Sequence, residues 1–342
     1  GPVGLTGQSD VLYHNNGNGT FTDVTAKAGI RDPNYYGFGV IFSDLDNDGW
    51  PDIYVANDSQ PNLLFRNNRN GTFSEAGVRS GAALNEAGRA QSGMGVTIGD
   101  YDGNGLPDIF VTNFARDTNT LYRNLGNLFF VDSTVSAGLG EISLSYLGWG
   151  TSLSDFDNDG LPDIFVANGH VYPQVDSLNV GQKYFQRKEL YRNLGNGKFE
   201  EIARTSPDLM IGKSSRGAAV ADFDNDGDLD ILVVNINDRP SLYRNDGGNR
   251  NHWTGFRLEG TQSNRSAIGA RVEIEAGNRK QISYVLSGGS YLSQGDLRVH
   301  FGLGATTRVD RVRIRWPNGN SEERGPFEAD RVISIKEGAA GQ

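Results

Sequence analysis

Runs of aspartate separated by single residues are the first feature of this sequence that could do chemistry. One run, DFDNDGLPDIFVAN, begins at Asp155 and contains four aspartates within nine residues. Carboxylates this close together repel one another strongly unless a cation lies between them. Aspartates at alternate positions of a tight turn can converge on one point, and Gly160 at the sixth position permits the sharp bend. The backbone carbonyl of Leu161 at the seventh position can face the same point.

This arrangement matches the first nine positions of a hand-type calcium loop, which has oxygen ligands at positions 1, 3 and 5, glycine at 6 and a carbonyl at 7. Here position 9 is an aspartate, and an apolar strand stands in place of the exiting helix. Because the loop offers oxygen ligands and no histidine or cysteine, it favours Ca²⁺ over zinc or copper. Magnesium is a poorer match, since it takes few protein ligands in a strict octahedral geometry.

The acidic loop occurs four times along the chain. The copies begin at Asp44, Asp100, Asp155 and Asp222, with spacings of 56, 55 and 67 residues. A solvated acidic turn would explain a single copy, but four copies at matching places favour about four calcium sites. The predicted ligands are the residues at positions 1, 3, 5, 7 and 9 of each loop: Asp44, Asp46, Asp48, Trp50, Asp52, Asp100, Asp102, Asn104, Leu106, Asp108, Asp155, Asp157, Asp159, Leu161, Asp163, Asp222, Asp224, Asp226, Asp228 and Asp230.

Two loops depart from the common pattern. Asn104 replaces an aspartate in the second loop, so the loop carries one charge fewer and weaker calcium binding is predicted there. Asp228 occupies position 7 of the fourth loop, where we expect its carbonyl to bind the metal and its side chain to face solvent. Paired aspartates could also suggest hydrolysis by two carboxylates. Four near-identical copies argue against that, because an active site is normally unique, and no catalytic residue is assigned.

The overall charge has its origin in these loops. The formal net charge is −10, and without the sixteen loop aspartates it would be +6. The acidity argues against nucleic acid as a partner. No apolar run approaches the roughly 18 residues of a membrane span, and the absence of cysteine excludes disulfides and thiolate zinc sites. No signal segment is recognisable at the start, so a secreted protein would be present here in mature form, and Gly1-Pro2 fits either a protease scar or a native start.

Each acidic loop lies between two segments that read as strands. Small residues precede it, as in residues 37–44 (GFGVIFSD), and an apolar run follows it, as in residues 164–166. A motif of the LYRN type comes next, and an additional copy, LYHNNGNGTF, begins at Leu12. A period of about 50 residues indicates a propeller or a solenoid. Asn-Gly hairpin turns and the lack of a helical period favour an all-β propeller.

The composition changes after about residue 245, where the acidic loops end. Residues 1–245 are predicted to form propeller blades, residues 246–338 a small β-sandwich, and residues 339–342 a tail. Five LYRN-type tails indicate about five blades. Two arrangements stay open: a five-bladed ring that residues 11–30 complete, or part of a longer, seven-bladed propeller. An incomplete propeller would expose strand edges and invite self-assembly or a partner.

Two further segments are candidates for ligand binding. The 67-residue interval contains an insertion, residues 169–187, which is too polar for a core strand and is predicted to be a long loop. Its residues His170, Tyr172 and Tyr184 are the candidate ligand-binding side chains, because loops on a rigid scaffold often carry function. The alternative is a self-packed loop with a buried histidine. In the glycine-rich segment 287–295 (SGGSYLSQG), we expect a closed hairpin rather than a sugar site.

These motifs resemble the FG-GAP/VCBS-type repeats of integrin α-subunit propellers. The stretches GTQSNRSAIGARVEIEAGNRKQ, SGGSYLSQ and RVHFGLGATTRVDRVRIRWPNG resemble the ASPIC/UnbV domain. Together they resemble the cartilage acidic protein family, in a bacterial-type member. The resemblance covers nearly the whole chain. It implies calcium at the four loops, an extracellular, secreted or periplasmic location, and no established catalytic residues.

The expected function is therefore that of an exported, calcium-binding adhesion or recognition module for a protein or a carbohydrate, with structural metals. Two other functions stay open. The chain could be a lyase-like enzyme acting on polysaccharides through the 169–187 insertion. It could also be a structural subunit of an extracellular assembly that forms through open propeller edges.

Overall fold

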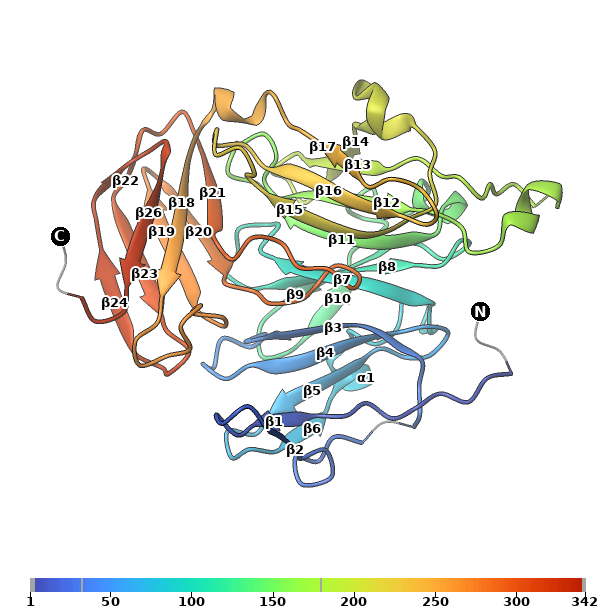
Figure 1. Cartoon of the computed structure of the whole chain (residues 1–342), viewed down its shortest axis with the longest axis horizontal. Helices are drawn as coiled ribbons and strands as arrows, with labels where there is room; N and C mark the ends of the chain where they lie inside the picture. The colour runs from blue at the N-terminus through green and yellow to red at the C-terminus, as the bar shows by residue number, and fades with distance from the viewer. Residues whose placement is uncertain (1–3, 32, 179, 340–342) are drawn as a thin grey trace.

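The computed structural model describes residues 4–31, 33–178 and 180–339, and their regular structure is almost entirely β (Figure 1). The predicted all-β class is confirmed. The short helical turns are α1 (Gly77–Ser80), η1 (Ser143–Ser145), η2 (Pro173–Ser177), η3 (Ala203–Thr205), η4 (Pro207–Met210) and η5 (Gly248–Arg250). No helix of the described residues is both long and apolar enough to cross a membrane.

Four antiparallel sheets correspond to the four acidic repeats, and we call them blades one to four. In strand order they contain β3 (Gly37–Ser43), β4 (Asp52–Asn57), β5 (Leu63–Asn67) and β6 (Phe73–Glu75); β7 (Gly93–Gly99), β8 (Asp108–Asn113), β9 (Thr120–Asn124) and β10 (Phe130–Asp132); β11 (Gly148–Ser154), β12 (Asp163–Asn168), β13 (Glu189–Asn193) and β14 (Phe199–Glu201); and β15 (Ser215–Ala221), β16 (Asp230–Asn235) and β17 (Ser241–Tyr243). The small-residue segments are the first strands of the blades, as the pattern predicted.

Small residues in the first strands let neighbouring blades approach closely. A Cβ atom at Gly39 would lie 2.6 Å from the carbonyl oxygen of Met94, and one at Gly95 would lie 2.1 Å from that of Trp149. Any side chain larger than hydrogen would clash there, because real Cβ atoms do not approach backbone atoms that closely. The first strands therefore line up side by side, and the four blades stack along this common inner edge (Figure 1).

The cores between blades follow from the two-residue period of the strands. We call the face of a blade that is turned toward the next blade its far face and the opposite one its near face. Alternate residues of each second strand point to opposite faces, so that Phe165 of blade three packs with Ile231 and Val233 of blade four. In the same way, Phe110 of blade two packs with Ile164 of blade three. Each blade boundary thus repeats one kind of apolar contact.

The blades are not closed into a five-bladed ring. Strands β1 (Tyr13–Asn15) and β2 (Phe21–Asp23) form a two-stranded sheet of their own, at the opposite end of the stack from β15 to β17 (Figure 1). Leu12 and Val24 pack instead against a cluster on blade one that contains Ile53 and Phe65. Residues 11–30 therefore do not complete the last blade, and this one of the two open arrangements is wrong for the described residues.

The residues after 251 form two larger sheets and one two-stranded sheet around a separate core, and we call residues 252–339 the C-terminal sandwich. One sheet contains β21 (Val299–Gly304), β18 (His252–Glu259) and β26 (Arg331–Lys336); the other contains β20 (Arg279–Tyr284), β19 (Arg271–Ala276), β23 (Arg311–Arg315) and β24 (Ser321–Arg324); and β22 (Arg308–Val309) pairs with β25 (Phe327–Glu328). Phe256, Val272, Ile274, Phe301 and Trp316 are among the buried residues of its core. The sandwich lies against one end of the blades (Figure 1).

Residues 287–296 of the sandwich do not close a hairpin, so that expectation is wrong. They connect β20 and β21, which belong to different sheets, and they run along the first strands of the blades. Ser290 exchanges backbone hydrogen bonds with Val96, at 2.6 and 3.0 Å. Its Oγ accepts a hydrogen bond from the N–H of Thr151 (3.0 Å) and donates one to the carbonyl of Ala218 (2.8 Å). One serine thus ties together the inner strands of blades two, three and four.

Candidate metal centres

Each acidic loop is the turn between the first and second strands of a blade. Position 1 follows the first strand, and position 9 is the first residue of β4, β8, β12 or β16. Backbone N–H groups close the turn by donating to the carboxylates. In the first loop, Asp48 and Gly49 donate to the two oxygens of Asp44, both at 2.9 Å. Asp52 accepts from Leu45 (3.2 Å) and from Asn67 (2.8 Å), so it joins the loop to the third strand.

Two positions of the loops have left-handed backbone conformations, which explains their residue types. Gly49, Gly105, Gly160 and Gly227 at position 6 have φ between 82° and 101°. Position 4 is also left-handed, with φ between 55° and 72°, and it holds Asn47, Gly103, Asn158 and Asn225. Glycine and asparagine adopt this conformation at the lowest cost. The DxDNDG pattern is therefore a backbone requirement as well as a set of ligands.

The structure brings three carboxylates together in every loop. Their oxygens lie within 4.8 Å of one another in these groups: Asp44, Asp46 and Asp48; Asp100, Asp102 and Asp108; Asp155, Asp157 and Asp163; and Asp222, Asp224 and Asp230. The remaining predicted carboxylates, Asp52, Asp159 and Asp226, lie in the same turns but outside these closest groups. The position 7 carbonyls accept no hydrogen bond from the described residues, which leaves them free to act as ligands: Trp50, Leu106, Leu161 and Asp228.

Burial makes these carboxylates costly to keep charged without a cation. Loss of hydration raises the pKa of Asp52 to about 7, and it raises those of Asp108 and Asp163 to about 8, against the lowering effect of their backbone hydrogen bonds. The same loss of hydration raises the pKa of Asp100 to about 6. A divalent cation would favour the charged form of all of them. The donor set, all oxygen and mostly carboxylate, fits Ca²⁺.

The fourth loop differs from the prediction at Asp228. Its side chain is fully buried rather than exposed to solvent, because Gly248 and Asn249 of the segment around η5 cover it. Its Oδ2 accepts a long hydrogen bond of 3.4 Å from the N–H of Asn249. Its Oδ1, and Oδ2 of Asp222, have no hydrogen-bond partner among the described residues. Buried carboxylate oxygens without partners are rare, so the fourth loop departs from the other three, where a position 6 N–H donates to the position 1 carboxylate.

The asparagine that ends the LYRN-type motif in blades two to four was not predicted to have a role, yet it connects the motif to the acidic loop of the preceding blade. The Nδ2 group of Asn124 donates to the carbonyl of Leu45 in the preceding blade's loop (2.9 Å). Asn193 and Asn245 make the same contact to Tyr101 and Phe156, at 2.8 and 2.7 Å. The repetition of the motif indicates a shared role for this asparagine. The sequence does not identify the carbonyl that accepts its hydrogen bond, which lies about 90 residues away in two cases.

The arginine of the LYRN-type motif binds a carboxylate of its own blade. Arg66 pairs with Asp46 at 3.2 Å, and Arg123 pairs with Asp102 at 2.5 Å. Both aspartates stand at position 3 of a loop. The arginine side chains are about half exposed, so these pairs contribute little to stability by themselves. In each pair the arginine holds the outer oxygen of an aspartate that is a predicted metal ligand.

The candidate residues of the insertion lie near one another but are partly closed to ligands. His170 is only 4% exposed, its Nδ1 accepts a hydrogen bond from the N–H of Tyr172 (3.1 Å), and its ring contacts Phe114. Burial lowers the pKa of His170. Tyr172 is half exposed, and the backbone of Tyr184 pairs with His170. The burial of His170 agrees with the alternative of a self-packed loop with a buried histidine. Ligand binding by His170, Tyr172 and Tyr184 stays a prediction.

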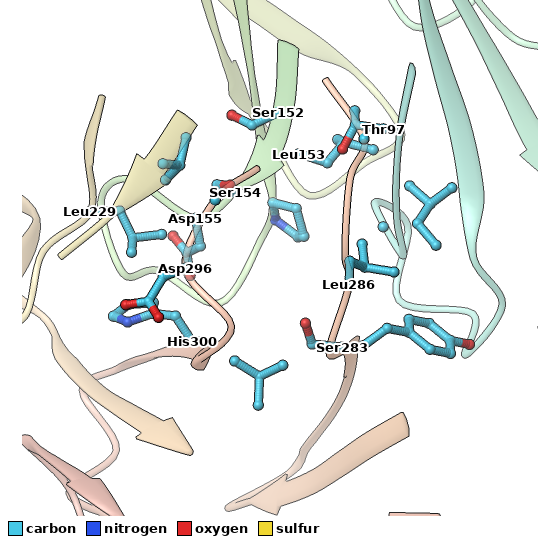
Figure 2. Close-up of a pocket in the computed structure, with 18 of the residues that line it drawn as sticks. Thr97, Ser152, Leu153, Ser154, Asp155, Leu229, Ser283, Leu286, Asp296 and His300 are labelled. Atoms are coloured by element: carbon cyan, nitrogen blue, oxygen red, sulfur yellow. The ribbon is translucent and has the colours of Figure 1, made fainter. Parts of the chain in front are cut away.

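A polar cavity of about 200 Å³ lies between the inner strands and the C-terminal sandwich (Figure 2). Figure 2 shows Ser152, Ser154 and Asp155 of blade three on one side and Asp296 and His300 of the sandwich near them. Sequence reasoning missed this cavity because its walls come from blades two to four and from the sandwich, which are distant in the chain. It adjoins the third acidic loop through Asp155.

Two family models match this chain. The model described as FG-GAP-like repeat matches residues 3–55, 44–111, 100–166 and 178–233, which together make up more than half of the chain. The model described as ASPIC and UnbV matches residues 260–342. The first model therefore covers all four acidic loops, and the second covers most of the C-terminal sandwich.

Among curated proteins, the chain is similar to cartilage acidic protein 1. It is 28% identical to that of Homo sapiens over 312 residues, which are 88% of this chain and 44% of the relative, and 26% identical to that of Xenopus tropicalis, over 90% of this chain and 46% of the relative. The chain thus spans less than half the length of these relatives. Among solved structures, the V. cholerae biofilm matrix protein Bap1 aligns with a TM-score of 0.33 and 14% identity over 94% of this chain and 59% of that chain, too loosely to support an argument.

Proposed function

Because this chain belongs to the FG-GAP-like repeat family and ends in an ASPIC and UnbV domain, as its motifs predicted, we propose that it is an extracellular or periplasmic recognition module stabilised by calcium. The observation that carries the proposal is the fourfold repetition of one oxygen cluster at one place in the blade. Equivalent, redundant sites are typical of a scaffold rather than of an active site. The module would bind a protein or a carbohydrate.

The proposed ligands of each ion are the carboxylates at positions 1, 3, 5 and 9 and the carbonyl at position 7, with Asn104 contributing its amide oxygen in the second loop. Bound calcium would supply the positive charge that the crowded carboxylates lack. The chain's own part is to hold the oxygens in place through backbone donors such as Gly49 and Gly160. Calcium sites of extracellular modules bind in the range of about 0.1 to 1 mM, which suits a location outside the cytoplasm.

Removal of calcium tests the proposal directly. Four sites that are each occupied at about ten times their Kd would stabilise the fold by about 1.4 kcal/mol apiece. We therefore expect a chelator to lower the melting temperature by on the order of 10 °C. Magnesium at the same concentration should restore little of the loss, whereas calcium should restore all of it. An unchanged melting temperature after chelation would exclude a structural role for calcium.

The ligand surface that we propose is the exposed part of the 169–187 insertion. Tyr172 is 48% exposed and could contact a partner, whereas His170 contributes mainly to the packing of the loop. Replacing Tyr172 by alanine should weaken binding to a glycan or matrix-protein panel without lowering the melting temperature. If the protein instead releases unsaturated sugars and His170→Ala abolishes that release, the lyase function is correct and the recognition proposal fails.

Self-assembly is a second candidate function, and the two end faces of the blade stack favour it. Leu232 and Val234 on the far face of blade four are 43% and 49% exposed. The residues in the same register on blade three, Phe165 and Ala167, are fully buried by the next blade. Val40 and Phe42 are likewise about half exposed on the near face of blade one. Exposed apolar sheet faces of this kind mark interaction surfaces.

A further inference from the structure

The acidic loops are also the surface on which the C-terminal sandwich docks, and three of the four loops contact it through side chains of that sandwich or of the segment leading into it. We propose that calcium binding at loops one, three and four and docking of the sandwich stabilise each other. This inference rests on the proposed calcium loops. It adds that Arg315, Arg279 and Arg298 act as positioning residues, which connect the metal loops to the second part of the chain.

At the first loop, the contact comes from Arg315 at the end of β23. Its Nη2 donates to Oδ2 of Asp44, the same oxygen that Gly49 holds, and its Nη1 donates to the carbonyl of Asn47 (3.4 Å). The hydroxyl of Tyr284 donates to Oδ1 of Asn47 (3.3 Å). The other oxygen of Asp44 accepts only from within the loop. The arginine therefore binds the outer side of the position 1 carboxylate.

At the third loop, several backbone carbonyls serve as acceptors. Arg279 donates from Nη1 to the carbonyl of Asp159, and the N–H of Gly304 donates to the carbonyl of Asn158 at 2.8 Å. Nε2 of His300 lies 2.6 Å from Oδ1 of Asn158. A Cβ atom at Gly302 would lie 2.0 Å from Oδ2 of Asp155. The sandwich thus fits closely on this loop, and a glycine is required where it meets the position 1 aspartate.

At the fourth loop, Arg298 at the start of β21 makes the contact. Its Nη2 donates to the carbonyl of Asp222 (2.7 Å), and its Nη1 donates to Oδ1 of Asn225 (2.8 Å). The linking segment adds the bonds from Asn249 to Asp226 and Asp228, which are long at 3.4 Å. This loop is therefore covered by the chain that leads into the sandwich.

The second loop provides an internal control. Within the described part of the chain, it makes no hydrogen bond to the sandwich, and its position 3 carboxylate, Asp102, pairs with Arg123 of its own blade. Its amide Asn104 donates to the carbonyl of Asn124, which also belongs to its own blade. Calcium at this loop should therefore stabilise blade two without affecting the docking of the sandwich.

The linkage has a physical basis in the atoms that the sandwich contacts. Half of them are loop carbonyls, such as those of Asn47, Asp159 and Asp222, and their positions depend on how tightly the turn is closed. Carboxylates that repel one another would open an unfilled turn, whereas a central cation closes it. Four carboxylates and one divalent cation leave the first loop with a negative formal charge, so Arg315 is still attracted after calcium binds. Linkage requires that docking then strengthens calcium binding by the same factor.

Hydrogen exchange on the full chain tests this inference. Backbone amides of residues 279–284, 298–304 and 311–315 should exchange on the order of tenfold faster in chelator than in calcium, at a temperature where the chain stays folded. The double variant Asp155→Asn and Asp163→Asn, at positions 1 and 9, should show the faster exchange in calcium. The matched variant Asp100→Asn and Asp108→Asn in the second loop should not. Equal effects of the two variants, or no effect of chelator on these amides, would overturn the proposal.

Calorimetry separates this result from the proposed function. If about four calcium ions bind but the exchange of the sandwich amides does not change, the linkage is wrong and the calcium loops stand. If no calcium binds, both fail. Arg279→Ala removes an exposed side chain and should leave folding intact. By reciprocity it should weaken one calcium site several-fold, and an unchanged set of four affinities would count against the linkage.

Discussion

A buried carboxylate needs a cation, a set of donors or a proton, and single residues of this chain show the different solutions. Burial raises the pKa of Asp163 to about 8, although two backbone N–H groups donate to it. Glu337, which is also buried, has the opposite environment. Burial would raise its pKa, but the N–H groups of Ser263, Thr261 and Gln262 lower it to about 2. The carboxylate of Asp163 would therefore be stabilised by a bound cation, whereas that of Glu337 is already stabilised by N–H donors of the protein.

Replacing Glu337 by glutamine should destabilise the fold in a pH-dependent manner. The three N–H donors lie 2.8 Å from one carboxylate oxygen, and bonds to a charged group contribute about 1.5 to 3 kcal/mol. Because the folded-state pKa lies below the ordinary value of 4.5, the stabilisation is present above about pH 4.5 and is lost as the pH falls toward 2. Denaturant unfolding at pH 7 and at pH 3 should show a smaller difference at pH 3. Glu323→Gln, at an exposed site, is the control, and a pH-independent loss would contradict the assignment.

The second loop allows a gain-of-function test at one residue. Asn104→Asp restores the charge that the other loops carry at position 5, so calcium binding at this loop should strengthen by on the order of tenfold. In a calorimetric titration of this variant, the weakest of the four calcium affinities should rise to the level of the other three. Asn18→Asp adds the same charge in the β1–β2 turn, where Asn18 accepts hydrogen bonds from Thr20 rather than from an acidic loop, and should leave the four affinities unchanged. If the weakest site persists in Asn104→Asp, the ranking of the loops by charge is incorrect.

Residue types and spacing predicted the loops themselves, but not what surrounds them. The clusters contain positions 1 and 3 with position 9, or with position 5 in the first loop, and all of these follow from local geometry, so a nine-residue pattern was enough to predict them. The side chain of Asp228 was assigned to solvent because position 7 is exposed in an isolated turn. It is buried by residues 248 and 249, which the turn alone cannot specify. The contacts that residues of distant segments, such as Arg315, make with the loops could not be predicted for the same reason.

At the scale of elements, the small-residue strands have a role that the repeat did not reveal. In blades one to three, a glycine of the first strand meets the first strand of the next blade. In blade four, the equivalent Gly217 meets Tyr291 and Ser293, and the N–H of Asp296 donates to the carbonyl of Val220 (3.0 Å). Residues 291–296 therefore lie beside blade four where the inner strand of a fifth blade would pack. They belong to the sandwich, which makes the sandwich part of the stack.

Ser290→Ala should lower the stability of the whole chain. The substitution leaves the N–H of Thr151 and the carbonyl of Ala218 without their buried partner, at a cost of about 1 to 3 kcal/mol. A thermal melt should show a midpoint lower by a few degrees, since about 1 kcal/mol corresponds to about 1 to 2 °C for a chain of this length. Ser287→Ala removes an exposed hydrogen bond to Gln294 and serves as the control. Equal midpoints for the two variants would show that Ser290 does not clamp the blades.

The whole molecule shows where sequence repeats stop being informative. Repeats predicted the order of strands within a blade, because that order depends on turns and on a two-residue apolar period. They could not predict whether the stack closes, since the same residues can face another blade or solvent. Leu232 and Val234 have the apolar character of their buried counterparts in earlier blades, although no blade of the described chain covers them. Closure is a property of the number and curvature of the blades rather than of any one motif.

If self-assembly is the function of these end faces, charges on blade four should abolish it. Within the chain, a far face always packs against the near face of another blade, as Phe165 does against Ile231. The far face of blade four and the part of the near face of blade one that Leu12 and Val24 leave open, with Val40 and Phe42, are thus complementary in kind, so we expect a head-to-tail contact between copies.

Sedimentation of the wild-type protein at high concentration should then show oligomers, and the double variant Leu232→Glu and Val234→Glu should be monomeric. Val78→Glu places the same charge at an exposed apolar site on α1 and should not change the association. A wild-type protein that stays monomeric would leave both faces to a different partner and would exclude this assembly.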